Sequence, residues 1–298
     1  MTETANGNDP SPKIQTIMTA RNIVITGATD GMGKLAAQEL ARQGARLLLI
    51  GRNRERCEAV KAECIAETGN QQVDYLVADL STVREVRRAA AEIKRQLDRI
   101  DTLVNNAGGA FPWRRTETGE GLELTFMLQY LSRYVLTKEL LDRLRASEDP
   151  LVMTVAGGGT YAKDLDLDDL QSERDYKKFA MIGKSAALNE LLTLEQAQRY
   201  EGITFCNYGP GLVRTKTTMA TPLARILFQS IGRLFTRSPE QAGADIARLA
   251  AGGHEGGFYG PKLKRNEPVW ARANAEVGPA LWEKTEELLG GLTAGGGP

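Results

Sequence analysis

Histidine is almost missing from this sequence. The chain has 298 residues and one histidine, His254. A Ser-His-Asp hydrolase or a Cys-His protease would have to use His254 as its base, and a zinc site would lack its usual ligands. Paired glycines flank His254, which is typical of a solvated loop. We therefore expect neither histidine-based hydrolysis nor a metal site.

Cysteine, net charge and long apolar runs are also scarce. Cys57, Cys64 and Cys206 are odd in number, which predicts reduced core residues in a cytoplasmic protein. The 38 basic residues balance 38 acidic ones, which argues against a nucleic-acid partner. No stretch approaches the roughly 20 apolar residues of a membrane span. Residues 1–18 predict a disordered N-terminal tail, and the glycine-rich residues 291–298 predict a flexible C-terminal one.

Short β-rich runs alternate with helical segments between these tails. The predicted strands are 23–26, 46–50, 73–78, 102–105, 151–155 and 203–207. Mostly apolar strands connected by crossover helices predict a parallel sheet with both faces covered. We therefore predict an α/β fold: one domain over residues 19–290, with a single doubly wound Rossmann-type sheet and helices on both faces.

Residues 122–144 predict one long helix. Leu124, Leu128, Leu131 and Val135 recur at helical spacing and form an apolar stripe toward the core. Helix phase alone leaves open whether Gln129 and Arg133 also point inward.

A glycine-rich turn follows the first strand directly. Residues 26–33 read Thr-Gly-Ala-Thr-Asp-Gly-Met-Gly and open into an apolar helix. Glycines at this place let backbone N–H groups approach a pyrophosphate at the helix N-terminus. Because the turn joins a strand to a helix, it predicts a dinucleotide site that includes Gly27, Thr29, Asp30, Gly31, Met32 and Gly33.

The end of the second strand indicates which dinucleotide binds. Sites for NAD usually carry an acidic residue there, which accepts a hydrogen bond from the ribose 2′-OH. This chain has Gly51, Arg52, Asn53 and Arg54 instead. Because Arg52 and Arg54 could pair with a 2′-phosphate, we predict NADP(H), with Arg52 and Asn53 in its site.

With three later motifs, residues 22–290 resemble the short-chain dehydrogenase/reductase family. These motifs are Ala78-Asp79-Leu80, Asn105-Asn106-Ala107-Gly108 and Pro210-Gly211-Leu212-Val213-Arg214-Thr215. Two more, at 238–241 and 257–260, look most like the retinol-dehydrogenase-type branch. The resemblance implies an oxidoreductase whose cofactor also contacts Asp79, Leu80, Asn106, Ala107, Gly108, Lys184, Pro210, Gly211, Val213 and Thr215.

The resemblance breaks down at the catalytic positions. The family uses a Tyr four residues before a Lys, a Ser at the end of the fifth strand and an Asn on the long helix. Counting back from Lys184, the Tyr position holds Ala180. The Ser position holds Ala156 or Gly157, and the Asn position holds Gln129. The usual proton relay is therefore absent, although the resemblance implies that Lys184 still binds the nicotinamide ribose.

Tyr161 and Tyr208 are candidates to replace the missing acid. Both follow predicted strands at their carboxyl ends, where ligands bind in open α/β sheets. The alternative is that each forms an aromatic wall of the pocket. Together with Lys184 and Gln129, they complete the candidate catalytic residues.

Residues 217–237 correspond to the family's substrate lid. Their apolar stripe suits a hydrophobic small molecule. An equal alternative is that the stripe packs onto the protein itself or onto a second subunit, so a homo-oligomer stays open.

Three functions fit these observations. The first is an unusual NADP(H)-dependent oxidoreductase for a bulky hydrophobic substrate of the secondary-metabolite type. The second is a cyclase or isomerase without redox chemistry, which acts by shape and electrostatics. The third is a catalytically inactive NADP(H)-binding protein.

Overall fold

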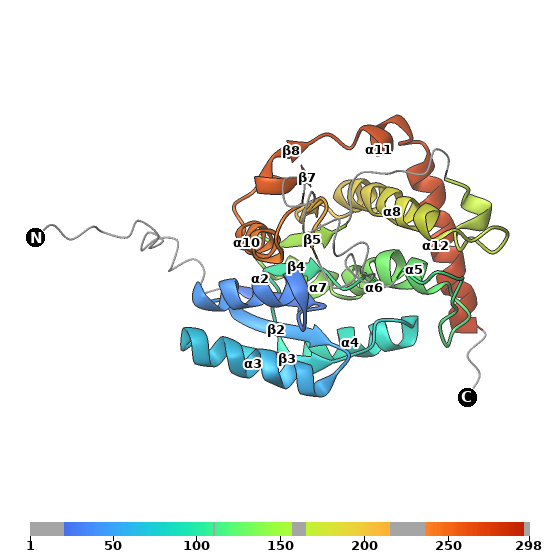
Figure 1. The fold of residues 1–298 in the computed structure, drawn as a ribbon. Coiled ribbons are helices and arrows are strands. Elements are labelled where there is room, and N and C mark those ends of the chain that lie inside the picture. The colour runs from blue at the N-terminus through green and yellow to red at the C-terminus, as the bar shows by residue number, and fades with distance from the viewer. Residues whose placement is uncertain (1–20, 110, 157–164, 215–235, 295–298) are drawn as a thin grey trace, which may run out of the picture.

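The computed structural model describes residues 21–109, 111–156, 165–214 and 236–294 (Figure 1). These residues form an eight-stranded sheet in the order β3-β2-β1-β4-β5-β6-β7-β8. The strands are β1 Asn22–Thr26, β2 Arg46–Gly51, β3 Val73–Val77, β4 Thr102–Asn105, β5 Leu151–Val155, β6 Thr204–Tyr208, β7 Gly257–Tyr259 and β8 Arg265–Asn266. The prediction of an α/β, doubly wound fold is confirmed.

The edge strand β8 is the one departure from parallel pairing in the described sheet. It runs antiparallel to β7, and the short 3₁₀ turn Pro261–Leu263 connects the two. A connection this short cannot hold a crossover helix, so the returning strand must reverse direction. The residues of β8 carry no strand pattern that predicts it.

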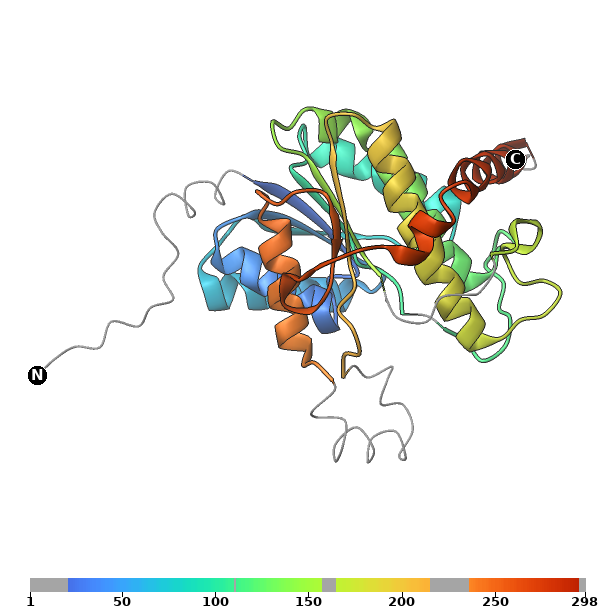
Figure 2. The ribbon, with the colours of Figure 1, turned by 90° about the horizontal axis from the view of Figure 1, so that it is seen from above.

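Helices cover both faces of the sheet (Figure 2). They are α2 Gly31–Arg42, α3 Arg54–Thr68, α4 Val83–Gln96, α5 Leu124–Phe126, α6 Ser132–Glu139, α7 Leu141–Arg145, α8 Lys178–Arg199, α10 Pro239–Ala250, α11 Val269–Ala273 and α12 Val277–Ala294. Helices α2, α3 and α10 pack on one face, and α4, α6 and α8 on the other. Each face has its own buried apolar cluster, which fixes the sheet between them.

Side-chain caps set the helix starts next to the carboxyl ends of the strands. Asp30 caps α2, Asn53 caps α3 and Thr82 caps α4. Ser238 and Gln241 form a reciprocal capping box at the start of α10. These caps satisfy N–H groups that have no intrahelical acceptor, so each helix begins at a defined residue.

The predicted single helix over 122–144 is wrong. The chain instead forms α5, a π-helical turn over Met127–Leu131, α6 and α7. Ser132 N bonds to Met127 O across the π turn, and non-helical angles at Leu140 separate α6 from α7. Such a turn inserts an extra residue and changes which side chains share a face. Apolar periodicity alone does not reveal it.

The last helix packs against α8 and against the segment from the π-helical turn to α6, and its Leu281 and Leu289 belong to the buried core. Thr285 Oγ1 lies 2.8 Å from Tyr130 Oη, and the rings of Trp282 and Tyr134 are 4.7 Å apart. Helix α12 continues to Ala294, past Gly290, where the sequence predicted the end of the domain. None of the helices in the described ranges is long and apolar enough to cross a membrane.

Candidate active site

The predicted phosphate-binding turn packs Gly27 and Gly33 tightly between β1 and α2. Gly27 and Gly31 have φ values of +67° and +54°, a region that favours glycine. A Cβ atom on Gly33 would lie 2.4 Å from both Gly27 O and Asn106 Nδ2. The turn therefore brings backbone to the N-terminus of α2, where N–H groups bind phosphate. This cradle fits the pyrophosphate of a dinucleotide.

Asn106 fixes the turn to the loop after β4. Its Nδ2 donates to Thr26 O at 2.9 Å and to Gly27 O at 3.1 Å. Thr26 Oγ1 accepts from the backbone N–H groups of Asn106 and Ala107 at 3.0 and 2.9 Å. The structure thus brings two predicted motifs together where the strand order reverses between β1 and β4, the usual ligand crevice of such sheets.

Arginines follow the end of β2, beside this turn. A Cβ atom on Gly51 would lie 2.4 Å from Thr29 Cγ2, so the two segments are in close contact. Arg52 is exposed, and within the described ranges no acceptor lies in hydrogen-bonding reach of it. Arg54 instead lies 3.9 Å from the Glu58 carboxylate. Of the two predicted phosphate partners, Arg52 is the better placed for a ligand.

Asp79 and Leu80 lie directly after β3. The Asp79 carboxylate accepts a hydrogen bond from Ser81 N at 3.0 Å, and Leu80 is buried. Ala78 N donates to Gly51 O, so these residues adjoin the end of β2, and the cofactor contacts implied for Asp79 and Leu80 stay predictions.

Lys184 lies on α8 with its ammonium already bonded to the protein. Its Nζ donates to Asp169 O and to Ser172 Oγ, both at 2.7 Å. Burial lowers the pKa of Lys184, although the nearby Asp169 carboxylate opposes this effect. The implied bond to the nicotinamide ribose stays a prediction, and it would require Lys184 to exchange these partners.

Ala180, at the position of the missing tyrosine, is exposed one turn before Lys184. Gln129, at the position of the helix Asn, is 7% exposed and faces the Asn-Asn-Ala-Gly loop. A Cβ atom on Gly108 would lie 2.5 Å from Gln129 Nε2. The structure therefore brings Gln129 and Gly108 into contact.

Tyr208 lies at the end of β6 and is fully buried. Its hydroxyl donates to Asp245 Oδ2 at 2.9 Å and accepts from Arg237 Nη1 at 2.7 Å. Arg237 also forms an ion pair with Asp245 at 2.7 Å. Burial, together with the Asp245 carboxylate, raises the pKa of Tyr208. These contacts favour a structural role, and the acid role stays a prediction.

Replacement of Tyr208 by phenylalanine is expected to reduce the free energy of unfolding by about 1–3 kcal/mol, because it leaves Asp245 and Arg237 with a partner missing. Turnover should change less than threefold. Urea denaturation and steady-state kinetics measure the two effects. A loss of turnover above a hundredfold with unchanged stability would instead identify Tyr208 as the acid.

The predicted nicotinamide loop follows β6. Gly211 has a φ of +72°, and Pro210 and Val213 are buried. Val213 forms a parallel bridge with Arg237, and Arg237 N donates to Leu212 O at 2.9 Å. Thr215, Tyr161, Gly157 and residues 217–235 of the lid lie outside the described residues, so predictions about them stay predictions.

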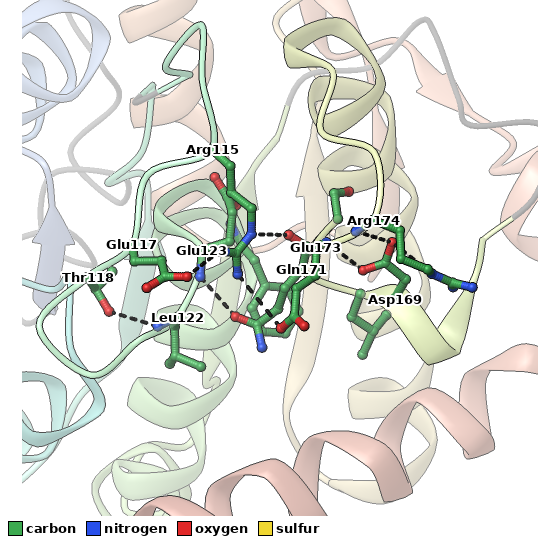
Figure 3. Close-up of polar contacts among 12 residues, drawn as sticks. Arg115, Glu117, Thr118, Leu122, Glu123, Asp169, Gln171, Glu173 and Arg174 are labelled. Carbon is green, nitrogen blue, oxygen red and sulfur yellow. Dashed lines mark hydrogen bonds and ion pairs between the residues drawn. The ribbon is translucent and has the colours of Figure 1, made fainter.

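Two loops at this edge of the sheet are tied together by polar contacts (Figure 3). Gln171 Oε1 accepts from Glu123 N at 2.9 Å, and Arg115 Nε donates to Gln171 O at 3.2 Å. Arg115 also lies 3.7 Å from the Glu173 carboxylate. The loop after β4 and the segment that holds Lys184 are therefore joined by hydrogen bonds.

Two large apolar side chains are exposed beside these loops. Trp113 and Phe179 are each 72% exposed, and their rings meet edge to face with centroids 6.1 Å apart. Lys178 Nζ lies 4.3 Å from the Trp113 ring centre. Phe179 directly precedes Ala180, so this pair lies beside the position of the missing tyrosine. The pair is therefore a candidate contact for an apolar ligand.

Sequence reasoning missed several polar residues of this region. Ser172 holds Lys184, and Asp245 holds Tyr208. Asp245 lies on the otherwise apolar buried face of α10. A polar residue at such a position indicates a buried hydrogen-bond partner, and that signal was present in the sequence.

The strand order, the glycine cradle and the asparagine-locked loop define a nucleotide-binding Rossmann fold. The chain belongs to the short-chain dehydrogenase family, whose members are oxidoreductases with an NAD(P)-binding Rossmann fold. A family model described as short chain dehydrogenase matches residues 21–162.

Curated relatives match most of the chain. A Streptomyces sp. (strain C5) protein provisionally named daunorubicin C-13 ketoreductase is 34% identical over 276 residues, covering 91% of this chain and 93% of that protein. Human retinol dehydrogenase 13 is 32% identical, with 91% and 85% covered. An alcohol dehydrogenase structure from Thermococcus sibiricus, complexed with 5-hydroxy-NADP, has a TM-score of 0.62 at 21% identity, with 83% and 99% covered. This last likeness shows the fold alone.

Proposed function

We propose that this protein is an NADP(H)-dependent oxidoreductase that acts on a bulky hydrophobic carbonyl compound or alcohol by an unusual route. The observation that carries the proposal is the glycine cradle, because Gly27 and Gly33 leave no room for a side chain at the start of α2, as the close backbone approach of a pyrophosphate-binding turn requires. Arg52 after β2, in place of an acidic residue, supports NADP(H) over NAD(H). Relatives named as a ketoreductase and a retinol dehydrogenase support the reaction class.

Different residues of this chain are proposed to bind different parts of the cofactor. Gly27, Gly31 and Gly33 would admit the pyrophosphate, and Arg52 would pair with the 2′-phosphate. When bound, NADPH supplies a hydride. The carbonyl carbon accepts it, the π-bond electron pair moves to the oxygen, and a proton from water completes the alcohol. Because Ala180 carries no hydroxyl, we infer that no side chain at that position delivers the proton.

Trp113 and Phe179 support the hydrophobic substrate. Replacement of either by alanine is expected to raise KM for a polycyclic aromatic ketone about tenfold, because each aromatic side chain contributes a large apolar contact area. The NADPH dissociation constant should stay within twofold and serves as the internal control. Fluorescence titration and steady-state kinetics measure both. An unchanged KM in both variants would contradict a substrate role for this pair.

The proposed function is tested with the purified full chain. NADPH consumption and product formation are followed with 1-tetralone, 9,10-phenanthrenequinone and all-trans-retinal. We expect stoichiometric oxidation of NADPH with at least one of them, at a low turnover number, and tighter binding of NADPH than of NADH by calorimetry. Binding of neither dinucleotide would refute the proposal.

The contacts of Lys184 favour a second candidate function, a cyclase or isomerase without redox chemistry. Its ammonium is satisfied by Asp169 O and Ser172 Oγ, so a hydroxyl-bearing cofactor must compete for it. Conversion of a polyketide-like or terpenoid substrate without net NADPH oxidation would select this candidate.

A further inference from the structure

A buried arginine lies one turn beyond Gln129. Arg133 is 2% exposed, and its guanidinium donates to Asn189 Oδ1 at 2.8 Å, Gln129 Oε1 at 2.9 Å, Val155 O at 2.9 Å and Ala107 O at 3.2 Å. None of these acceptors, all within the described residues, is a carboxylate. Burial lowers the pKa of Arg133 to about 9. Because a buried cation without an ion-pair partner reduces stability, its presence indicates a role beyond packing.

The guanidinium connects the loops of the candidate active site. Ala107 belongs to the loop after β4, and Val155 ends β5. On the third side, Asn189 Nδ2 donates to Gln129 O at 2.8 Å and to Ser185 O at 2.7 Å. Gln129 is thus held against α8 through Asn189, at the carboxyl edge of the sheet where ligands bind.

Arg133 also decides how the Gln129 amide is oriented. A guanidinium has donors and no acceptor, so the amide must turn Oε1 toward it and Nε2 away. A Cβ atom on Gly108 would lie 2.5 Å from Nε2 and 2.7 Å from Oε1, so the amide borders Gly108, and within the described ranges Nε2 has no hydrogen-bond acceptor. Because Nε2 is not among the side-chain atoms that are sealed from solvent without a partner, it is available to donate to a ligand oxygen beside Gly108.

We propose that Gln129 Nε2 donates a hydrogen bond to the reacting oxygen of the substrate, and that Arg133 is the positioning residue that holds the amide for it. This inference rests on the proposed function. As the carbonyl carbon gains the hydride, the electron pair on oxygen is stabilised by the amide N–H, which keeps its proton. Water supplies the proton of the alcohol. The role partly offsets the loss of the hydroxyls at positions 180 and 157.

Gln129→Glu is the sharpest test, because a carboxylate keeps the volume and still accepts from Arg133 but cannot donate. We expect kcat for the most active ketone to fall about tenfold to a hundredfold, with NADPH affinity within threefold and the melting temperature within 3 °C of wild type. Gln71→Glu is the matched control for the added charge, because Gln71 is exposed and is not part of the candidate site. Wild-type kcat in Gln129→Glu would overturn the donor assignment.

A spectroscopic readout separates a donor from a structural residue. Isotope-edited infrared spectra of 1-tetralone with a ¹³C-labelled carbonyl, bound together with NADP⁺, should show a lower carbonyl stretching frequency in wild type than in Gln129→Glu. Equal frequencies in the two proteins would overturn the assignment. Failure of the wild-type protein to reduce any ketone would refute the proposed function itself, whereas an active wild type with an equally active variant refutes only the role of Gln129.

Arg133→Met tests the positioning role. We expect the same loss of kcat and the same carbonyl frequency as in Gln129→Glu, with partial recovery in Arg133→Lys. Should Arg133→Met fail to fold, Gly108→Ala displaces the amide from the opposite side, since its Cβ would lie 2.5 Å from Nε2. Wild-type kcat and frequency in Arg133→Met would overturn the role of Arg133, and the same result in Gly108→Ala would overturn the requirement for the amide to be held in this position.

Discussion

Replacement of Arg52 by glutamate is expected to weaken NADPH binding about a hundredfold, which corresponds to about 2.7 kcal/mol. Arg52 follows the end of β2, is exposed and has room for a ligand. Its guanidinium would form charge-assisted hydrogen bonds with a 2′-phosphate, each worth about 1.5–3 kcal/mol before screening by solvent. A glutamate removes these bonds and repels the phosphate, but it can accept from the 2′-OH of NADH.

Arg54→Gln is the control for this substitution. Arg54 lies 3.9 Å from Glu58 and also donates to Tyr75, so its loss should change NADPH affinity less than threefold. Isothermal titration calorimetry with NADPH and NADH measures all three proteins. Equal or tighter binding of NADH by the wild type would contradict the NADP(H) assignment, and equal effects of the two substitutions would contradict the distinction between the arginines.

Replacement of Ala180 by tyrosine is expected to raise ketone turnover by about 10²-fold, because a positioned general acid contributes roughly 10²–10⁴ in rate. Position 180 is exposed on α8, one turn before Lys184, so the larger side chain meets solvent instead of the core. The new phenol would lie on the face of the helix that bears Lys184.

Ala180→Phe is the control that distinguishes the effect of the hydroxyl group from the effect of the aromatic ring. It should leave kcat within threefold of the wild type while adding the same apolar volume. Single-turnover measurements with saturating NADPH and the most active ketone give the rate of the chemical step. No gain in Ala180→Tyr over Ala180→Phe would show that the site cannot use an acid at this position.

The framework of the fold could be predicted because its signals are local. Strands such as β1 and β5 are mostly apolar, and the glycines between Gly27 and Gly33 directly follow such a strand, so both signals can be recognised from neighbouring residues. The π-helical turn at Met127–Leu131 could not be predicted in this way, because it depends on tertiary packing around the helix.

The candidate site was predictable only in part. The motifs identified Asn106 and Lys184, but the partners of Lys184 depend on how the 166–172 segment folds back over α8. Likewise, the contacts of Arg133 join residues that are 22 to 56 positions apart in sequence. Spacing along one helix cannot reveal a cation that is shared among four separate segments.

The bridge between Val213 and Arg237 has a consequence for how this protein can change over evolution. Both ends of the intervening segment are fixed by backbone pairing at the edge of the fold. Because these contacts fix where the chain leaves the described fold and where it returns, insertions or exchanges between these two residues should disturb the sheet little. Substrate range is therefore free to diverge among relatives when this one segment is replaced. The residues proposed to bind the cofactor need not change with it.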